Sequence, residues 1–274
     1  MTRGKPDQAA KVRKNTVPGM PICCIFATFH ISCKPMPVIR EINPAPGIRA
    51  GIWQISESSL ELMKNLRPGS PDMEYAASIR NESRKRQFMA CRALLRQMLL
   101  PLQEELSVDP FGKPFLDSGR RQVSLSHTAG FAAVAVSDIF PVGIDIERTQ
   151  ERLGRVKERF LQERETGMLP AGINHDWLTL LWSVKEAVYK LHGRPDIDLR
   201  NDIHVHPIDY LCNTGSNGTA TLSRPAGKSR VALYFTQVED HVMTVAWNNN
   251  DPTPYHSPSR RGAWGEVIED RKFI

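Results

Sequence analysis

The sequence predicts an α+β fold made of two similar halves, a pseudo-dimer in which each half packs one long helix on a small antiparallel sheet. Two stretches of the chain repeat apolar residues at helical spacing, and each is accompanied by short alternating stretches typical of strands. The order strand, helix, then antiparallel strands occurs twice along the 274 residues. We therefore expect an N-terminal half at residues 49–137 and a C-terminal half at 138–247.

The N-terminal half is expected to open with a short strand at 51–55 and to continue with a long helix at about 81–100. Apolar residues fall near helical spacing in that helix, and Pro101 ends it. Turn residues separate the short strands expected after it, which span 115–116, 123–127 and 131–136.

The C-terminal half repeats this order. It begins with a strand at 142–147 and a helical stretch at about 153–165. The most strongly patterned helix of the chain follows at 176–192, where Gly193 and Pro195 stop it. Strands at 231–237 and 242–247 close the half.

The two ends of the chain carry a different composition. Residues 1–48 are rich in Lys, Arg and Pro and show no sustained period, so they predict a peripheral basic segment. Residues 248–274 are rich in polar residues and proline, and predict a flexible tail. No apolar run approaches the roughly 20 residues that a membrane-spanning helix needs.

Composition narrows the class of protein without identifying it. The net charge of +6 favours an anionic partner, such as nucleic acid, a lipid surface, a phosphorylated cofactor or an acidic protein. Five cysteines without a C-x-x-C pair argue against a disulfide framework or a structural zinc site. We expect reduced thiols and a cytoplasmic location.

The strand at 142–147 carries two carboxylates on one face. Val142, Ile144 and Ile146 alternate with Gly143, Asp145 and Glu147, so the second set shares the face away from the core. Asp145 and Glu147 then lie within about 7 Å of each other, which is unfavourable unless a positive charge lies between them. Gly143 is expected to leave this face open for a ligand. The alternative is a solvated strand face with acidic residues.

The helix at 176–192 has one apolar stripe and one polar side. Glu186 and Lys190 are one turn apart on the polar side, whereas Trp182 is expected to pack in the core. The alternative is an ordinary surface ion pair, worth only about 0.3–0.5 kcal/mol.

Taken together, these blocks resemble the signature motifs of the 4'-phosphopantetheinyl transferase superfamily, in its longer, two-halved form. The matching blocks are Gly112-Lys113-Pro114, Ser126-His127, Gly143-Ile144-Asp145-Ile146-Glu147 and Trp182-Ser183-x-Lys185-Glu186-Ala187-x-x-Lys190. Two further stretches, Arg84 to Arg96 and Phe160 to Leu169, resemble the family's basic first helix and its segment between the acidic motifs. The resemblance covers about Ile52 to Trp247.

The resemblance implies a magnesium site and an active site at the interface between the halves. Asp145, Glu147 and Glu186 would hold one Mg²⁺, which prefers oxygen ligands and commonly bridges carboxylates to substrate phosphates. Glu186 would be the general base, Lys190 would contact a phosphate, and Asp145 would be catalytic through the metal. Replacing Asp145 with alanine is then expected to abolish activity and leave the fold intact.

The resemblance also assigns residues to the co-substrate, coenzyme A. Ser126, His127 and Lys190 would lie at its phosphates, and Lys113 would contact its nucleotide. Arg86 and Arg92 would bind its 3'-phosphate, for which a guanidinium is well suited. Lys185 corresponds to the family's lysine before the glutamate, although on a helix it points about 100° away from Glu186.

The implied activity is the transfer of the 4'-phosphopantetheine arm of coenzyme A to a serine of an apo acyl or peptidyl carrier protein, with release of 3',5'-ADP. The expected partners are coenzyme A and the carrier, with no nucleic acid and no membrane, and the protein is expected to be a monomer. The alternative is a non-catalytic protein that binds coenzyme A or nucleic acid through its basic helix.

Overall fold

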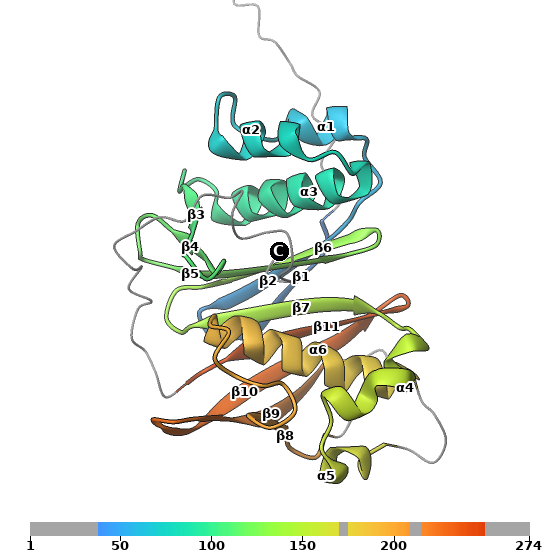
Figure 1. Cartoon of the computed structure of the whole chain (residues 1–274). Coiled ribbons are helices and arrows are strands. Elements are labelled where there is room, and N and C mark those ends of the chain that lie inside the picture. Colours follow the sequence, from blue (N-terminus) through green and yellow to red (C-terminus); the bar gives the residue numbers. More distant parts are fainter. Residues whose placement is uncertain (1–37, 170–174, 209–214, 250–274) are drawn as a thin grey trace, which may run out of the picture. The chain divides into compact units, whose positions relative to one another are not determined.

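The computed structural model describes residues 38–169, 175–208 and 215–249, which all belong to one compact unit (Figure 1). It confirms a mixed α+β fold with antiparallel sheets. Most of the predicted peripheral segment 1–48 and nearly all of the predicted tail 248–274 lie outside the described residues. None of the described helices is long and apolar enough to cross a membrane.

The first sheet has four antiparallel strands in the order β1-β2-β6-β5. They are β1 (Val38–Ala45), β2 (Ile48–Gln54), β6 (Phe131–Ser137) and β5 (Gln122–Thr128). Strand β1 lies inside the segment predicted to be peripheral, so the ordered sheet begins earlier than the sequence indicated. A two-stranded pair, β3 (Leu106–Val108) with β4 (Pro114–Leu116), precedes β5.

The helices of this part of the chain begin at side-chain caps. The capping side chains accept hydrogen bonds from the first turn of α1 (Ser59–Met63), α2 (Pro71–Ser78) and α3 (Glu82–Leu99), and belong to Ser58, Ser70 and Asn81. Helix α3 therefore spans the predicted stretch 81–100. It covers the first sheet closely, because a Cβ on Gly51 of β2 would lie 2.9 Å from Met98 Sδ.

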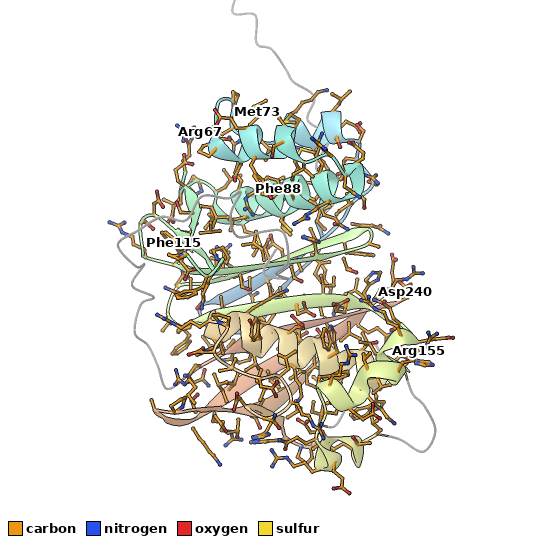
Figure 2. The ribbon with its side chains drawn as sticks, viewed as in Figure 1. Arg67, Met73, Phe88, Phe115, Arg155 and Asp240 are labelled. Carbon is orange, nitrogen blue, oxygen red and sulfur yellow. The ribbon has the colours of Figure 1, made fainter. Side chains whose placement is uncertain are left out.

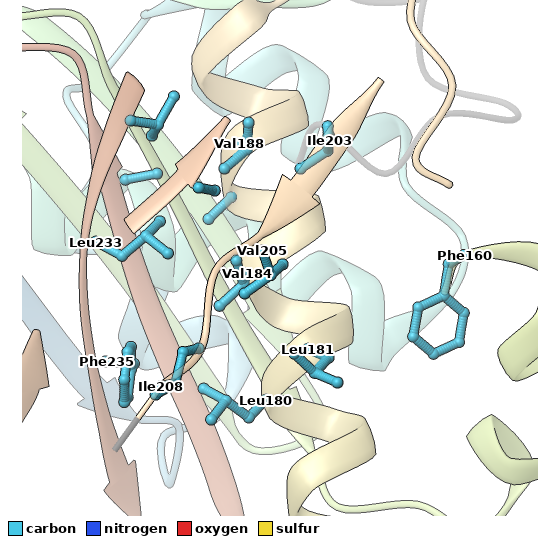
Figure 3. Close-up of a cluster of buried hydrophobic side chains, with 14 of the residues drawn as sticks. Phe160, Leu180, Leu181, Val184, Val188, Ile203, Val205, Ile208, Leu233 and Phe235 are labelled. Carbon is cyan, nitrogen blue, oxygen red and sulfur yellow. The ribbon is translucent and has the colours of Figure 1, made fainter. Parts of the chain in front are cut away.

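The second sheet has five antiparallel strands in the order β7-β11-β10-β9-β8. They are β7 (Val142–Arg148), β11 (His241–Trp247), β10 (Gly227–Val238), β9 (Ser216–Arg224) and β8 (Ile203–Val205). Helix α6 (His175–His192) lies on one face of this sheet, as the apolar stripe predicted. Figure 3 shows Val184 and Val188 of α6 facing Leu233 of β10 and the β8 residues Ile203 and Val205.

The helical stretch predicted at 153–165 is broken into three short pieces. These are α4 (Arg152–Val156), a 3₁₀ turn (Lys157–Arg159) and α5 (Glu163–Thr166). The break follows Phe160, which is buried against Trp182 of α6 with 5.0 Å between ring centroids. A new helix then starts at Gln162, where the Glu165 side chain accepts the Gln162 backbone N–H.

The two sheets pack face to face between their helices. Alanines and isoleucines of β2 and β6 contact the inner face of β7 and β11 in one apolar cluster, which includes Ala133, Ile144 and Met243. The resulting order of layers is α3, first sheet, second sheet, α6 (Figure 1). Strands β5 and β7 lie next to each other at one margin of this stack, and the predicted motifs gather there.

Candidate functional site

Two serines of β5 close the free edge of β7. Among the described strands, β7 is the outermost of the second sheet, so the backbone N–H groups on its outer side have no ladder partner there. Ile144 N–H donates to Ser124 Oγ at 3.0 Å, and Ile146 N–H donates to Ser126 Oγ at 3.2 Å. These two bonds hold the acidic strand against the strand that ends in His127.

Ser124 is a residue whose role the sequence did not indicate, and it allows a direct test. Ser124→Ala leaves the buried Ile144 N–H without its acceptor, which typically costs about 1–3 kcal/mol. We expect chemical denaturation to show a loss of this size. Ser107→Ala, which removes an exposed serine bond to Asp117, is the control and should change stability by less than about 0.5 kcal/mol. Equal losses in both variants would contradict this role of Ser124.

Asp145, Ser126 and Lys190 form a buried polar cluster. Asp145 Oδ1 accepts from Ser126 Oγ at 3.1 Å and from Lys190 Nζ at 2.9 Å, and Lys190 Nζ also donates to Ser126 Oγ at 2.8 Å. Only 3% of Asp145 and 5% of Lys190 are exposed. Neither the solvated strand face nor the surface ion pair with Glu186, considered above as alternatives, describes these residues.

Helix α6 carries Glu186 between two residues that contact the acids of β7. At one end of the contact, Trp182 Nε1–H donates to Glu147 Oε1 at 3.1 Å. Two turns later, Lys190 reaches Asp145. Because Glu186 is one turn from each of these helix residues, it lies on the stretch of α6 between the two contacts. Trp182 was expected only to pack in the core, but its indole N–H also holds one of the acids.

The expectation that Gly143 leaves room for a ligand is wrong. A Cβ at this position would lie 2.0 Å from Ala187 O and 2.5 Å from Leu191 N, both backbone atoms of α6. Gly143 is therefore the point of closest approach between β7 and α6. The absence of a side chain there allows the helix to lie near the acids, and so serves the site indirectly.

The carboxylates fit the chemistry of a magnesium site. Carboxylate oxygens are the ligands that Mg²⁺ prefers, and the neighbouring elements β7 and α6 carry the three predicted ones, Asp145, Glu147 and Glu186. Among the described residues, the buried Asp145 Oδ2 atom has no hydrogen-bond partner, as expected of an oxygen that is directed at a ligand. The described part of the chain contains no ready-made group of three or more His, Cys, Asp or Glu side chains close enough to hold an ion. The Lys190 ammonium instead supplies the positive charge beside Asp145.

His127 lies at the end of β5, close to charges from both sides of the site. Burial, with the positive charges of Lys190, Arg84 and Arg92, lowers the pKa of His127 to about 4, whereas the Asp145 charge opposes this shift. The imidazole is therefore neutral at pH 7. Since the surrounding charges are mainly positive, an anionic group of a ligand would be favoured beside it.

The two predicted arginines of α3 lie in different environments. Arg86 is partly buried, and its Nε atom has no hydrogen-bond partner within the described ranges. Arg92 is buried, donates from Nε to Asp72 Oδ1 of α2 at 3.0 Å, and lies 4.4 Å from the centroid of the Phe88 ring. Figure 2 labels Phe88 on α3. The structure thus gives Arg92 a contact that fastens α2 to α3, and its predicted contact with coenzyme A stays a prediction.

Lys113 fastens the β3–β4 turn to the end of α6. Asp109 Oδ1 shapes the turn by accepting the N–H groups of Phe111 and Lys113, each at 2.8 Å. Lys113 Nζ, on a side chain that is 4% exposed, donates to Leu191 O at 2.6 Å. Its predicted contact with a nucleotide is not tested, but the contact seen here is a cap on the carbonyl end of the helix.

Burial lowers the pKa of Lys113 to about 8, so stability should depend on pH at this residue. In the unfolded chain the pKa returns to the ordinary lysine value of 10.5. Between pH 8 and 10.5 the unfolded chain therefore binds more protons, and the Lys113 contribution to stability rises with pH, by up to about 3 kcal/mol. The difference in unfolding free energy between wild type and Lys113→Met should grow in favour of wild type over this window. The exposed Lys64→Met change is the control, and a difference independent of pH would contradict the assignment.

Comparison with known proteins identifies the part of the chain that carries the acids. Residues 141–246 match the family model described as the 4'-phosphopantetheinyl transferase superfamily. This part of the chain is therefore similar to that superfamily. The chain is also similar to the "4'-phosphopantetheinyl transferase gsp" of Aneurinibacillus migulanus, with 33% identity over 87 residues. That similarity covers 31% of this chain and 36% of the relative, so the chain spans about a third of the length of the curated relative it matches.

The superfamily match includes β7, α6 and the other strands of the second sheet. It therefore contains Asp145, Glu147, Glu186 and Lys190. The residues predicted from the first half lie outside it, and they are Arg86, Arg92, Lys113, Ser126 and His127. For Ser126 and His127, proximity to Asp145 and Lys190 is what links them to the superfamily segment.

Proposed function

We propose that the protein transfers the 4'-phosphopantetheine arm of coenzyme A to a serine of an apo acyl or peptidyl carrier protein and releases 3',5'-ADP. The observation that carries this proposal is the buried cluster of Asp145, Ser126 and Lys190 beside Glu147 and Glu186. The match of residues 141–246 to the transferase superfamily supports it, because the matched residues include all three acids.

The active site in this proposal lies between the two halves of a pseudo-dimer. Ser126 and His127 come from the first sheet, whereas Asp145 and Lys190 come from β7 and α6. The serine bonds that join β5 to β7 keep these groups in a fixed register. A ligand bound there would contact side chains from both halves.

Asp145, Glu147 and Glu186 would hold Mg²⁺, which would neutralise the charge of the coenzyme A pyrophosphate. The chain's own groups bind and orient the substrate. Lys190 places a positive charge where charge develops on the leaving group. The neutral His127 would hydrogen-bond a phosphate. Arg86, whose Nε–H has no partner within the described residues, would bind the 3'-phosphate.

The reaction is a phosphoryl transfer in which positioning does most of the work. The carrier serine oxygen forms a bond to the β-phosphorus of coenzyme A, and the bond from that phosphorus to the bridging oxygen breaks. Glu186 accepts the serine proton, and 3',5'-ADP leaves with the bridging oxygen. The excluded water and fixed charges of a buried site favour this step over hydrolysis.

The partner in this proposal is a carrier with an acidic surface. The chain has a net charge of +6, and complementary charge accelerates the encounter of two proteins. The serine of the carrier would enter the site as the acceptor of the phosphopantetheine arm.

Incubation of the purified protein with coenzyme A, Mg²⁺ and a panel of apo carrier proteins tests the proposal. Transfer adds the phosphopantetheine arm to the carrier, a mass gain of about 340 Da that mass spectrometry detects. Coenzyme A binding without any mass gain would favour the non-catalytic alternative. Binding to DNA that weakens steeply with salt, again without transfer, would favour a nucleic-acid-binding protein.

A further inference from the structure

A fully buried ion pair lies on a different flank of α6 from the carboxylate site. Lys185 Nζ donates to Glu165 Oε2 at 2.8 Å, and both side chains are 0% exposed. The remaining donors of Lys185 bond two backbone carbonyls, Leu199 O at 2.9 Å and Ile203 O at 2.8 Å. An ammonium group has three N–H donors, so each has an acceptor.

Glu165 uses both of its oxygens. Oε2 accepts the Gln162 N–H at 2.9 Å in addition to Lys185, and Oε1 accepts the Val205 N–H at 2.8 Å. The pair therefore connects α5, the segment 199–205 and α6 through directional bonds to backbone atoms. Burial lowers the pKa of Lys185, whereas its bond to Glu165 raises it, so the carboxylate offsets the cost of burying the ammonium.

Lys185 directly precedes Glu186, so the two side chains are about 100° apart around the helix axis. Helix α6 is thus held on two sides. Gly143 allows its backbone to touch β7 at Ala187, and the ion pair fixes the flank that bears Lys185. A helix fixed on two sides can neither rotate about its axis nor slide along it without breaking one of these contacts.

We propose that Lys185 and Glu165 are positioning residues. They set the rotation of α6 about its axis and its position along that axis, and thereby place Glu186 and Lys190 over β7. The proposal rests on the proposed transferase function for its catalytic consequence. Buried ion pairs rarely add net stability over apolar residues of the same volume, so stability alone does not account for this pair. Its bonds to carbonyls fix an orientation, and an error of about 1 Å at a reacting group can lower a rate by about 100-fold.

The test compares wild type with Lys185→Met/Glu165→Gln, a double variant that leaves no buried charge unpaired. Lys228→Met, at an exposed lysine of β10, is the matched control. We expect the double variant to fold, with kcat lowered by about 10- to 100-fold and KM for coenzyme A changed by less than about threefold. The kcat of the single variant Glu165→Gln, which keeps Lys185, should lie between those of the double variant and wild type.

A second measurement does not depend on activity. Trp182 Nε1–H bonds Glu147, so its indole NMR resonance, assigned with Trp182→Phe, reports the position of α6 over β7. This resonance should move in the Glu165→Gln and double variants and stay in place in Lys228→Met. Folded variants with unchanged kcat and an unmoved Trp182 resonance would overturn the proposal. A wild-type protein without transfer activity would refute the transferase function instead, and the resonance would still decide whether the pair positions α6.

Discussion

Asp145→Asn is expected to lower kcat for phosphopantetheine transfer by at least about 100-fold and to raise the Mg²⁺ concentration needed for half-maximal rate by at least about tenfold. Asparagine keeps the shape of the side chain and an oxygen acceptor for Ser126. It removes the charge that faces Lys190 and that would bind the metal. Transfer assays across a magnesium titration measure both effects.

The asparagine variant is more informative than alanine because Asp145 also stabilises the fold. Asp145→Ala leaves the Lys190 ammonium buried without its partner, which typically costs about 3–5 kcal/mol. The expectation from the sequence, that alanine removes a metal ligand and leaves the fold intact, therefore needs correction. Asp138→Asn, at an exposed acid, is the control. A folded Asp145→Asn protein with wild-type, magnesium-dependent activity would remove Asp145 from the site.

Gly143→Ala is expected to destabilise the protein by at least about 3 kcal/mol. Its Cβ would lie 2.0 Å from Ala187 O and 2.5 Å from Leu191 N, and neither backbone atom can move without displacing α6. Thermal or chemical denaturation measures this loss, and any folded fraction should also lose transfer because Glu186 and Lys190 move with the helix.

Gly167→Ala is the matched control for this change. Its Cβ would meet Arg164 O at an ordinary 3.5 Å, and Gly167 has a right-handed helical backbone with φ of −67°. That substitution should be neutral or stabilise the protein by up to about 1 kcal/mol. If Gly143→Ala were as stable as Gly167→Ala, β7 and α6 could not be packed as described.

Local patterns predicted the elements whose residues repeat with a clear period. Helix α3 was predicted within one residue at each end because Asn81 and Pro101 mark its limits, and α6 began one residue earlier than predicted. Strand β7 was predicted because its apolar residues alternate with Gly143, Asp145 and Glu147. In contrast, β1 and the short β8 depend on pairing with distant strands, which a local pattern does not show.

The sequence predicted the residues of the site more completely than the contacts among them. Asp145, Ser126 and Lys190 were all named from the sequence, but their mutual hydrogen bonds depend on how β5, β7 and α6 come together. The same holds for Ser124, whose hydroxyl gains a role only because an edge strand of the other sheet lies beside it. Gly143 was misjudged because its function depends on a helix 44 residues later in the chain, at Ala187.

The two serine hydroxyl groups that cover the edge of β7 also affect how the protein associates with copies of itself. A strand edge with unsatisfied N–H groups is a template on which another molecule can add a strand, and it promotes aggregation. At β7 the hydroxyl groups of Ser124 and Ser126 take up the N–H groups of Ile144 and Ile146 that an incoming chain would need. The same two side chains that align the acids thus shield this edge from the strands of neighbouring copies.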